Sequence, residues 1–569
     1  MYQRRYATEI GIRSWGSAGI VCSLLNLAAC GGGGSVASAP PPAPPPSVSA
    51  ADAARLLEQA TFGVTASDVA HVQSVGIDAY INEQLAYPPT QYTGYSYTPH
   101  TAPAGCVGDG SKPPDAASLC ARDQYSPFQV QRDFFTHALN NPDQLRQRVA
   151  FALSQIMVVS SVEIYEAYGL ADYENILLRD ALGNYRTLLQ DVTLSPTMGH
   201  YLDMADSDKT NSQNGTVPNQ NYAREVMQLF SIGLVELNPD GTQQLDANGA
   251  PVPTFDGSTI EGLASVFTGW TYPPRPGANS QWTNPINFDG TMVVFPDHHQ
   301  PGTKLLLNGY TVPANQTPEQ DLANALDDIF NHPNVGPFIG QQLIQHLVTS
   351  NPSPDYVARV AAVFANNGQG VRGDLSAVVR AILTDSEARG DAPATNLFGR
   401  LREPALFITS TLRNLGGQSD GVLLRSASSA MGQPIFSPET VFSFYPPRYQ
   451  VPGTHTLGPE FGIANAATAL ARANFVNTVI MQGGAAADPT VSGSTGTSID
   501  LTPFLGAGSS SALVAQLNQI LMHGSLSSAA SNIVLESLYS VAASSTNPLA
   551  GPQAASYLIL SSAQYQVER

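Results

Sequence analysis

The chain is poor in lysine, in tryptophan and in long apolar runs, and these shortages exclude several classes of protein. Only three of its 26 basic residues are lysines, and 45 acidic residues give a formal net charge of −19. A chain this acidic, with no basic stripe, repels nucleic acid and anionic lipid surfaces, so we expect no nucleic-acid partner. After residue 30, no run reaches the ~18 apolar residues of a membrane-spanning helix.

The first 30 residues are typical of a bacterial export signal. Basic residues precede an apolar stretch at 20–25, and the tetrapeptide Leu-Ala-Ala-Cys ends at Cys30. That tetrapeptide resembles the lipoprotein signal, in which the cysteine becomes the diacylated N-terminus. We therefore predict that residues 1–29 are removed and that lipids on Cys30 anchor the chain to a membrane. The alternatives are ordinary cleavage nearby and a short buried helix.

The segment that follows is typical of a tether. Residues 30–50 are rich first in Gly and Ser and then in Pro, a composition that gives a flexible and then an extended chain. Gly31 stands where an Asp is usually linked to retention in the inner membrane. We therefore expect an outer-membrane lipoprotein of the cell envelope, whose body faces either the periplasm or the cell surface.

Only two cysteines lie beyond the predicted anchor. Cys106 and Cys120 flank a polar loop, and in an exported protein such a pair predicts a disulfide. Closing a loop of this size stabilises a fold by about 3 kcal/mol in the chain-entropy model. A metal site is the weaker alternative, because no His lies within a few residues of either Cys.

Most of the chain from residue 51 has the pattern of amphipathic helices. Thr317-Pro318-Glu319-Gln320 is a capping box with Pro at the first helical position. Apolar residues then recur at helical spacing. They are Leu322, Ala325, Leu326, Ile329 and Phe330. We predict a mainly α fold, with residues 51–569 as a single large helical domain.

Strand signals are few and local. Asn308-Gly309 is a strong hairpin signal between 303–307 and 310–313, and Asn248-Gly249 is a second one. We therefore expect a small β insertion near 240–315. Residues 485–512 are rich in Gly, Ser and Thr and predict a flexible loop. Two closing helices, at 511–522 and 528–542, should follow that loop.

Several strings resemble one family, the bacterial "domain of unknown function 1800" family. The strings lie at 54–63, 143–149, 182–186, 218–225, 268–270, 299–304, 402–404 and 432–434. Two positions depart from the family pattern, since Gln220 and Gln300 stand where the family usually has acids. A third departure is the stretch 441–447, which replaces a Trp motif. The resemblance implies export, a helical body and a sulfatase-like neighbour, but it implies no reaction and no cofactor.

The string 218–225 opens a predicted helix that carries the first candidate site residues. Asn221, Arg224, Glu225 and Gln228 recur at helical spacing and share one face. A carboxylate beside a guanidinium can serve as an oriented base, a metal ligand or a clamp for an anion. The competing interpretations are a solvated helix face and a structural ion pair.

A second group of candidates follows at Asp297-His298-His299, ahead of Lys304. Histidine and aspartate are metal-ligand types, but adjacent His side chains in an extended segment point in opposite directions. A metal would need a ligand from elsewhere in the chain, such as Glu225, so metal content stays unknown. An acid–base role, a substrate-binding role and a purely structural role for His299 remain open.

Tryptophan supplies the third group. Trp270 and Trp282 lie between the predicted helix and the histidines. Flat aromatic rings beside carboxylates and amides suit sugar rings. The competing interpretation is that both are core residues beneath a loop. The clustering makes 218–304 the candidate site.

Two functional hypotheses follow from these groups. In the first, the protein is an envelope enzyme acting on a polymer such as polysaccharide, with Glu225, Arg224 and His299 as catalytic candidates. Substrate contacts would come from Asn221, Trp270, Trp282 and Lys304. In the second, it is a non-catalytic lipoprotein that binds such a polymer or a partner protein, for example the sulfatase-like neighbour. The sequence does not decide whether the protein is an enzyme.

Overall fold

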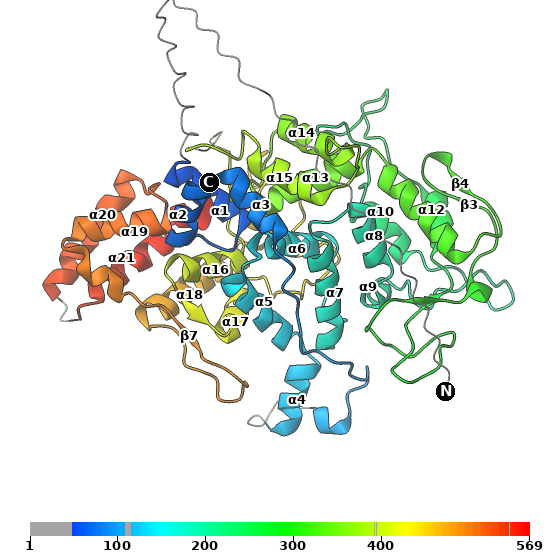
Figure 1. Cartoon of the computed structure of the whole chain (residues 1–569), viewed down its shortest axis with the longest axis horizontal. Helices are drawn as coiled ribbons and strands as arrows, with labels where there is room; N and C mark the ends of the chain where they lie inside the picture. The colour runs from blue at the N-terminus through cyan, green and yellow to red at the C-terminus, as the bar shows by residue number, and fades with distance from the viewer. Residues whose placement is uncertain (1–47, 108–114, 392, 394, 396, 545–546) are drawn as a thin grey trace, which may run out of the picture. The chain divides into compact units, whose positions relative to one another are not determined.

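Helices dominate the computed structural model, which describes residues 48–107, 115–391, 393, 395, 397–544 and 547–569 (Figure 1). The first helices are α1 (Ala50–Ala60), α2 (Ala66–Val75), α3 (Ile77–Ala86), α4 (Ala116–Gln124), α5 (Phe128–Asn140), α6 (Gln144–Ile156), α7 (Ala167–Asp180), α8 (Tyr185–Thr193), α9 (Pro196–Tyr201), α10 (Asn221–Gln228) and α11 (Gly257–Val266). The later ones are α12 (Pro318–Asn331), α13 (Val335–Leu347), α14 (Pro354–Ala365), α15 (Leu375–Thr384), α16 (Pro404–Asn414), α17 (Val422–Ala430), α18 (Ala466–Val476), α19 (Ser510–Leu521), α20 (Ser528–Ser544), α21 (Ala550–Leu560) and α22 (Ala563–Gln566). The predicted mainly α fold is confirmed.

Short elements connect these helices. The strands are β1 (Trp270–Thr271), β2 (Val293–Val294), β3 (Lys304–Leu305), β4 (Thr311–Val312), β5 (Arg400–Leu401), β6 (Gln418–Ser419), β7 (Thr497–Ser498) and β8 (Val567–Glu568). The short 3₁₀ segments are η1 (Ala104–Cys106), η2 (Pro296–His298), η3 (Leu307–Gly309), η4 (Pro459–Ile463) and η6 (Thr502–Ala507), and η5 (Asn477–Met481) is a π-helical turn.

The capping box predicted at Thr317 is present at the start of α12. The Thr317 side chain accepts a hydrogen bond from the backbone N–H of Gln320, and the Gln320 side chain accepts one from the backbone N–H of Thr317. Both orphan donors of the first turn are therefore satisfied. Leu322, Ala325, Leu326 and Ile329 are buried, as their spacing predicts.

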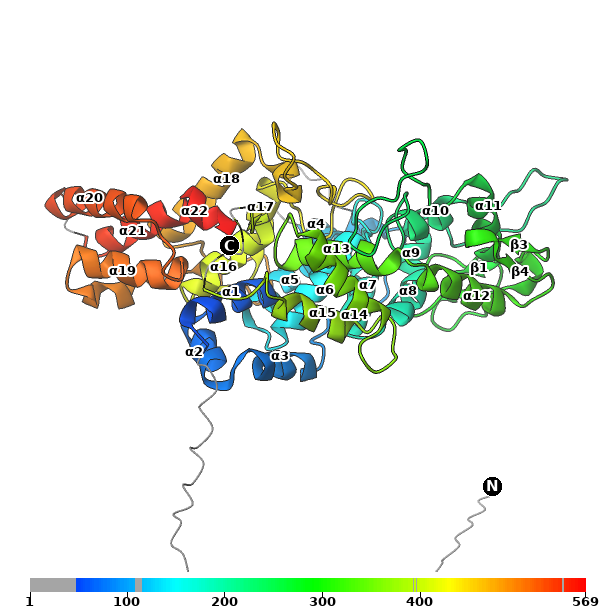
Figure 2. The ribbon, with the colours of Figure 1, turned by 90° about the horizontal axis from the view of Figure 1, so that it is seen from above.

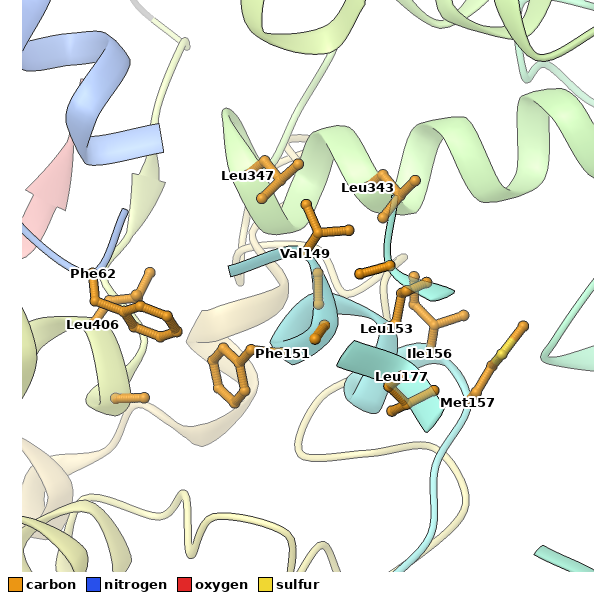
Figure 3. Close-up of a cluster of buried hydrophobic side chains, with 14 of the residues drawn as sticks. Phe62, Val149, Phe151, Leu153, Ile156, Met157, Leu177, Leu343, Leu347 and Leu406 are labelled. Carbon is orange, nitrogen blue, oxygen red and sulfur yellow. The ribbon is translucent and has the colours of Figure 1, made fainter. Parts of the chain in front are cut away.

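The core is centred on α6. Figure 3 shows Val149 of α6 facing Leu343 and Leu347 of α13, while Leu153 and Ile156 lie beside Leu177 of α7. Such packing places α6 between α13 and α7, and nearly every residue of α6 is buried. Both views of the Ser47–Arg569 unit set α19–α21 at one end and α12, β3 and β4 at the other (Figures 1 and 2).

The hairpins form where the Asn-Gly pairs predict them. β3 and β4 pair antiparallel around Asn308 and Gly309, whose φ angles of 52° and 76° belong to the left-handed region. Both central residues of a tight hairpin turn need positive φ, which Asn and Gly tolerate best. Around Asn248-Gly249, Leu245 pairs with Pro251.

The pairing of β5 with β8 has no counterpart in the sequence analysis. Arg400 lies opposite Glu568, so the end of the chain joins its middle. Two-residue strands have no periodicity to detect, which is why only the fold reveals this pair.

The C-terminal part contains more helices than predicted. α19 and α20 match the two predicted closing helices closely, but α21 and α22 follow them. The stretch 485–512 holds β7, η6 and the first residues of α19. The predicted signal, Cys30 and most of the tether lie outside the described residues. No described helix is both long enough and apolar enough to cross a bilayer.

The predicted disulfide between Cys106 and Cys120 is present. It joins η1 to α4 and closes a segment whose middle lies outside the described residues.

Candidate functional site

The polar residues of α10 do not all face solvent. Tyr222 and Val226 are buried as expected, but Glu225 is only 7% exposed, whereas Arg224 is exposed. Burial raises the pKa of Glu225 and outweighs the lowering by Arg224. Its Oε2 has no hydrogen-bond partner among the described residues. Asn221 donates to Asp203 Oδ2 at 3.2 Å. The Glu225 carboxyl is therefore buried and has a pKa above its ordinary value.

His299 and Lys304 come together, but through an aspartate that the sequence analysis did not select. His299 Nε2 lies 2.9 Å from Asp321 Oδ2, and Lys304 Nζ lies 2.6 Å from the same oxygen. His299 Nδ1 faces Thr268 O at 2.9 Å. All three side chains are at most 3% exposed. Both ring nitrogens of His299 are thus already used: Nε2 joins the loop before β3 to α12, and Nδ1 joins it to the segment between α11 and β1.

The two tryptophans have different environments. Trp270 is buried in β1, and no residue that the structure describes accepts a hydrogen bond from its indole N–H. Trp282 is partly exposed and stacks on His298, with ring centroids 4.0 Å apart. No hydrogen bond or ion pair among the described residues joins Glu225 to His299. The roles predicted for these residues remain predictions. The described residues also contain no group of three His, Cys, Asp or Glu side chains suited to a metal ion.

A dense group of buried charges lies elsewhere, and we call it the central charge network. Its members are four glutamates and four arginines that are nearly inaccessible to solvent. They are Glu58, Arg148, Arg400, Arg402, Glu403, Glu460, Arg472 and Glu568. Burying so many charges is costly unless they are paired.

Pairing within the network starts from β5. The β5–β8 register sets Arg400 opposite Glu568, and Arg400 Nε lies 2.6 Å from Glu568 Oε2. Arg400 Nη1 also lies 3.6 Å from Glu403 and 3.9 Å from Glu460. Arg402 contacts Glu58 on α1. The network therefore links the first helix, the middle of the chain and the last strand.

Glu403 is the most heavily bonded acid of the network. It occupies the N-cap position of α16 without a side-chain capping bond, and the helix dipole there favours negative charge. Its Oε2 accepts hydrogen bonds from Gln155, Gln433 and Tyr445, at 3.0, 2.6 and 2.9 Å. Burial opposes ionisation, but Arg400 and Arg148 prevail and lower the pKa of Glu403. Glu403 is therefore an ionised carboxylate.

A cavity of about 60 Å³ lies beside this carboxylate. α6, α13, η4 and the loop 441–447 enclose it. Its polar lining consists of Gln155, Gln342, Gln345, His346, Ser443, Tyr445 and Glu460. Phe442 at the same cavity is 52% exposed, and the neighbouring Ser443 has a positive φ of 62°. Such backbone strain in a non-glycine residue is concentrated at functional sites.

The titratable groups of the cavity differ in proton affinity. Burial raises the pKa of Glu460 to about 7, although Arg400 opposes the shift. Burial also lowers the pKa of His346 to about 4, against the influence of Glu403. No described residue makes a hydrogen bond to the His346 ring. Near neutral pH the cavity therefore holds a neutral imidazole and a carboxyl group that still carries a proton part of the time, next to the ionised Glu403. Groups with separated pKa values are what acid–base chemistry needs.

A family model described as "Protein of unknown function (DUF1800)" matches residues 55–567. The chain belongs to this family. Nothing among curated proteins and nothing among solved structures matches the chain.

Several strings that carry the DUF1800 resemblance meet at the central charge network. The string 54–63 supplies Glu58, 143–149 supplies Arg148, and 402–404 supplies Arg402 and Glu403, while 432–434 supplies Gln433, which donates to Glu403. The stretch 441–447, which departs from the family's usual Trp motif, supplies Tyr445 to the cavity wall. The network is thus the place where distant family strings become neighbours.

No sequence pattern pointed to His346, Tyr445 or Glu460 as site residues. Each stands alone in its local sequence, and nothing in the spacing brings them together. The usable signal was the Arg402-Glu403-Pro404 string, which places two charges directly before a helix that begins with Pro. That string marked the family but was not assigned a role.

Proposed function

We propose that this protein is a cell-envelope lipoprotein that acts on a carbohydrate polymer by acid–base hydrolysis, with the cavity at His346 and Glu460 as its reaction centre. The observation that carries the proposal is the meeting, in one cavity, of a neutral imidazole and a carboxyl group with a pKa of about 7. The predicted lipid on Cys30 and the tether to residue 50 would hold this centre at an envelope surface.

The size of the cavity limits the reaction. About 60 Å³ admits one small group and no complete sugar ring. An acyl ester on a sugar hydroxyl is such a group, and apolar neighbours such as Ile156, Leu229 and Pro459 would accept its hydrocarbon part. The proposed substrate is therefore an acyl-substituted polysaccharide.

The chemistry needs only water as a second reactant. His346 takes a proton from water while the water oxygen attacks the ester carbonyl carbon. The bond from that carbon to the sugar oxygen then breaks, and Glu460 gives its proton to the departing oxygen. The products are a carboxylic acid and a free sugar hydroxyl. The proton on His346 returns to Glu460 through solvent. Glu403 and its donor Tyr445 hold the wall in place.

The test compares two glutamates in the purified full-length lipoprotein. Release of acid from acylated polysaccharides is measured for the wild type, Glu460→Gln and Glu225→Gln. We expect Glu460→Gln to lose at least about 100-fold in rate, a typical contribution of one acid–base group. Glu225→Gln should keep most of the activity. The reverse result would move the reaction centre to α10, and an unaffected Glu460→Gln would exclude the cavity.

One observation favours a non-catalytic second function. The central charge network holds equal numbers of Glu and Arg. A balanced network of this kind can have a purely structural role, which is to specify the fold. In that case the protein is a scaffold that binds a polymer or a partner such as the sulfatase-like neighbour. Binding without turnover on any acylated polymer, in a folded wild-type protein, would support this function over hydrolysis.

A further inference from the structure

A second hollow, of about 600 Å³, lies between the segment 93–103 and helices α4, α5 and α7. Four tyrosines line it together with two aspartates. They are Tyr95, Tyr97, Tyr125, Tyr168, Asp123 and Asp133. No residue lines both this hollow and the cavity at Glu460. It is about ten times larger than that cavity and has room for whole sugar rings.

Contacts within the protein hold the tyrosines in place. Tyr95 donates its hydroxyl hydrogen to Asp133 Oδ2 at 2.7 Å, and Tyr125 donates to Pro99 O at 3.0 Å. The rings of Tyr97 and Tyr168 meet edge to face, with centroids 5.7 Å apart. Because these side chains are already ordered, a ligand would lose little affinity in immobilising them.

One wall of the hollow is also covalently fixed. Pro103 lies directly before η1, and Asp123 lies near the end of α4. The Cys106–Cys120 disulfide joins these two elements. Asp123 is held in turn by Arg122 at 2.7 Å and by Gln129 at 3.0 Å. This wall is therefore preorganised.

The polar groups of the hollow favour a neutral ligand rich in hydroxyls. Asp133 uses Oδ2 for Tyr95, which leaves Oδ1 to accept a hydroxyl hydrogen. Two carboxylates in a chain with a net charge of −19 repel sulfate and uronic-acid groups. Aromatic rings offer the apolar surface on which the C–H face of a sugar packs.

We propose that this hollow binds a neutral polysaccharide, with sugar rings against Tyr97 and Tyr125 and a sugar hydroxyl on Asp133. The class of polymer rests on the proposed function. The polymer would be held at the hollow, on a surface separate from the cavity at Glu460.

The test measures binding alone, with the full-length lipoprotein in detergent. The probes are a neutral glucan, a uronic-acid polymer and a sulfated galactan, examined by affinity electrophoresis and calorimetry. We expect binding of the glucan only. Tyr125→Ala and Asp133→Asn should each weaken it by about tenfold, equivalent to about 1.4 kcal/mol. Tyr125→Phe, which keeps the ring, should bind like the wild type.

Matched variants separate this proposal from others. Tyr539→Ala, at an exposed tyrosine of α20, should leave binding unchanged. Glu460→Gln should also bind the glucan normally, so that a failure of the reaction centre cannot be mistaken for a failure of the hollow. Near-ultraviolet circular dichroism checks that the variants fold. Unchanged affinity in folded Tyr125→Ala and Asp133→Asn, or preferred binding of the sulfated or uronic polymer, would overturn the proposal.

Discussion

Single residues of the cavity show how burial and charge compete. Glu460 and Glu403 both lie within 4 Å of Arg400 Nη1. Three hydrogen bonds to one oxygen help to keep Glu403 ionised, whereas Glu460 accepts a hydrogen bond from Ser350. The Arg400 guanidinium therefore lies near two different acids: Glu403, which is ionised, and Glu460, whose pKa is raised.

The raised pKa of Glu460 predicts a pH-dependent stability. Its pKa is about 7 in the folded chain against 4.5 for the free side chain, so the folded state binds the extra proton between these values. The stabilisation is complete below pH 4.5 and is lost as the pH rises to about 7. In Glu460→Gln this loss is absent. We compare the free energy of unfolding of the variant with that of the wild type at each pH. From pH 4.5 to pH 8 this difference should shift by up to about 3 kcal/mol in favour of the variant.

Denaturant unfolding of both proteins at the two pH values measures this difference. Parallel changes in the two proteins would show that Glu460 titrates normally.

At the scale of elements, the contact between α11 and the β3–β4 hairpin depends on a glycine. A Cβ added to Gly262 would lie 1.8 Å from the backbone oxygen of Leu305. β3 therefore crosses α11 at a position where no side chain can be accommodated.

Replacing Gly262 by Ala should separate these two elements. Alanine favours a helix by up to about 1 kcal/mol, but the steric overlap with backbone exceeds that gain. We expect a lower melting temperature and faster hydrogen exchange in β3 and β4. Gly257→Ala, at a position in the same helix with open space, serves as the control and should be neutral or slightly stabilising. Equal melting temperatures for the two variants would exclude a tight contact.

The buried contact between α12 and the loop before β3 gives a second prediction. Asp321→Asn removes the charge that faces both Lys304 and His299. Breaking a buried ion pair typically costs about 3–5 kcal/mol, because the remaining charge is left uncompensated. Asp327→Asn on the same helix removes an exposed partner of Arg186 and should cost less than about 1 kcal/mol. Chemical denaturation compares the two variants, and similar losses would mean that the buried cluster contributes little.

At the scale of the whole molecule, distant parts of the chain meet at the central charge network. Arg400 contacts Glu568, Arg402 contacts Glu58, and Arg148 donates to Thr61 O and His346 O. The first helix and the last strand are thus held to the same centre. The folded body carries both the cavity and the tyrosine-lined hollow, and the predicted tether would attach it near α1.

The predicted anchor is tested by Cys30→Ser. Without the thiol no lipid can be added, and the chain should move from the membrane fraction to the soluble envelope fraction. The folded body should keep its stability, because no residue of the network precedes Glu58. Cell fractionation with a labelled fatty acid measures the change. Unaltered membrane association and absence of label in the wild type would contradict lipidation.

The sequence by itself determined what depends on neighbouring residues. Helical spacing, the capping box at Thr317, the turn at Asn308-Gly309 and the pairing of two isolated cysteines are all local or near-local features. Short strings, occurring in the same order as in the DUF1800 family, predicted the family, and the family model confirms it. Only the tertiary structure decided which charges meet. It paired Arg400 with Glu568 and His299 with Asp321, and it gathered His346, Tyr445 and Glu460 around one cavity. Burial and long-range pairing set the proton affinities of these groups, and no spacing along the chain encodes them.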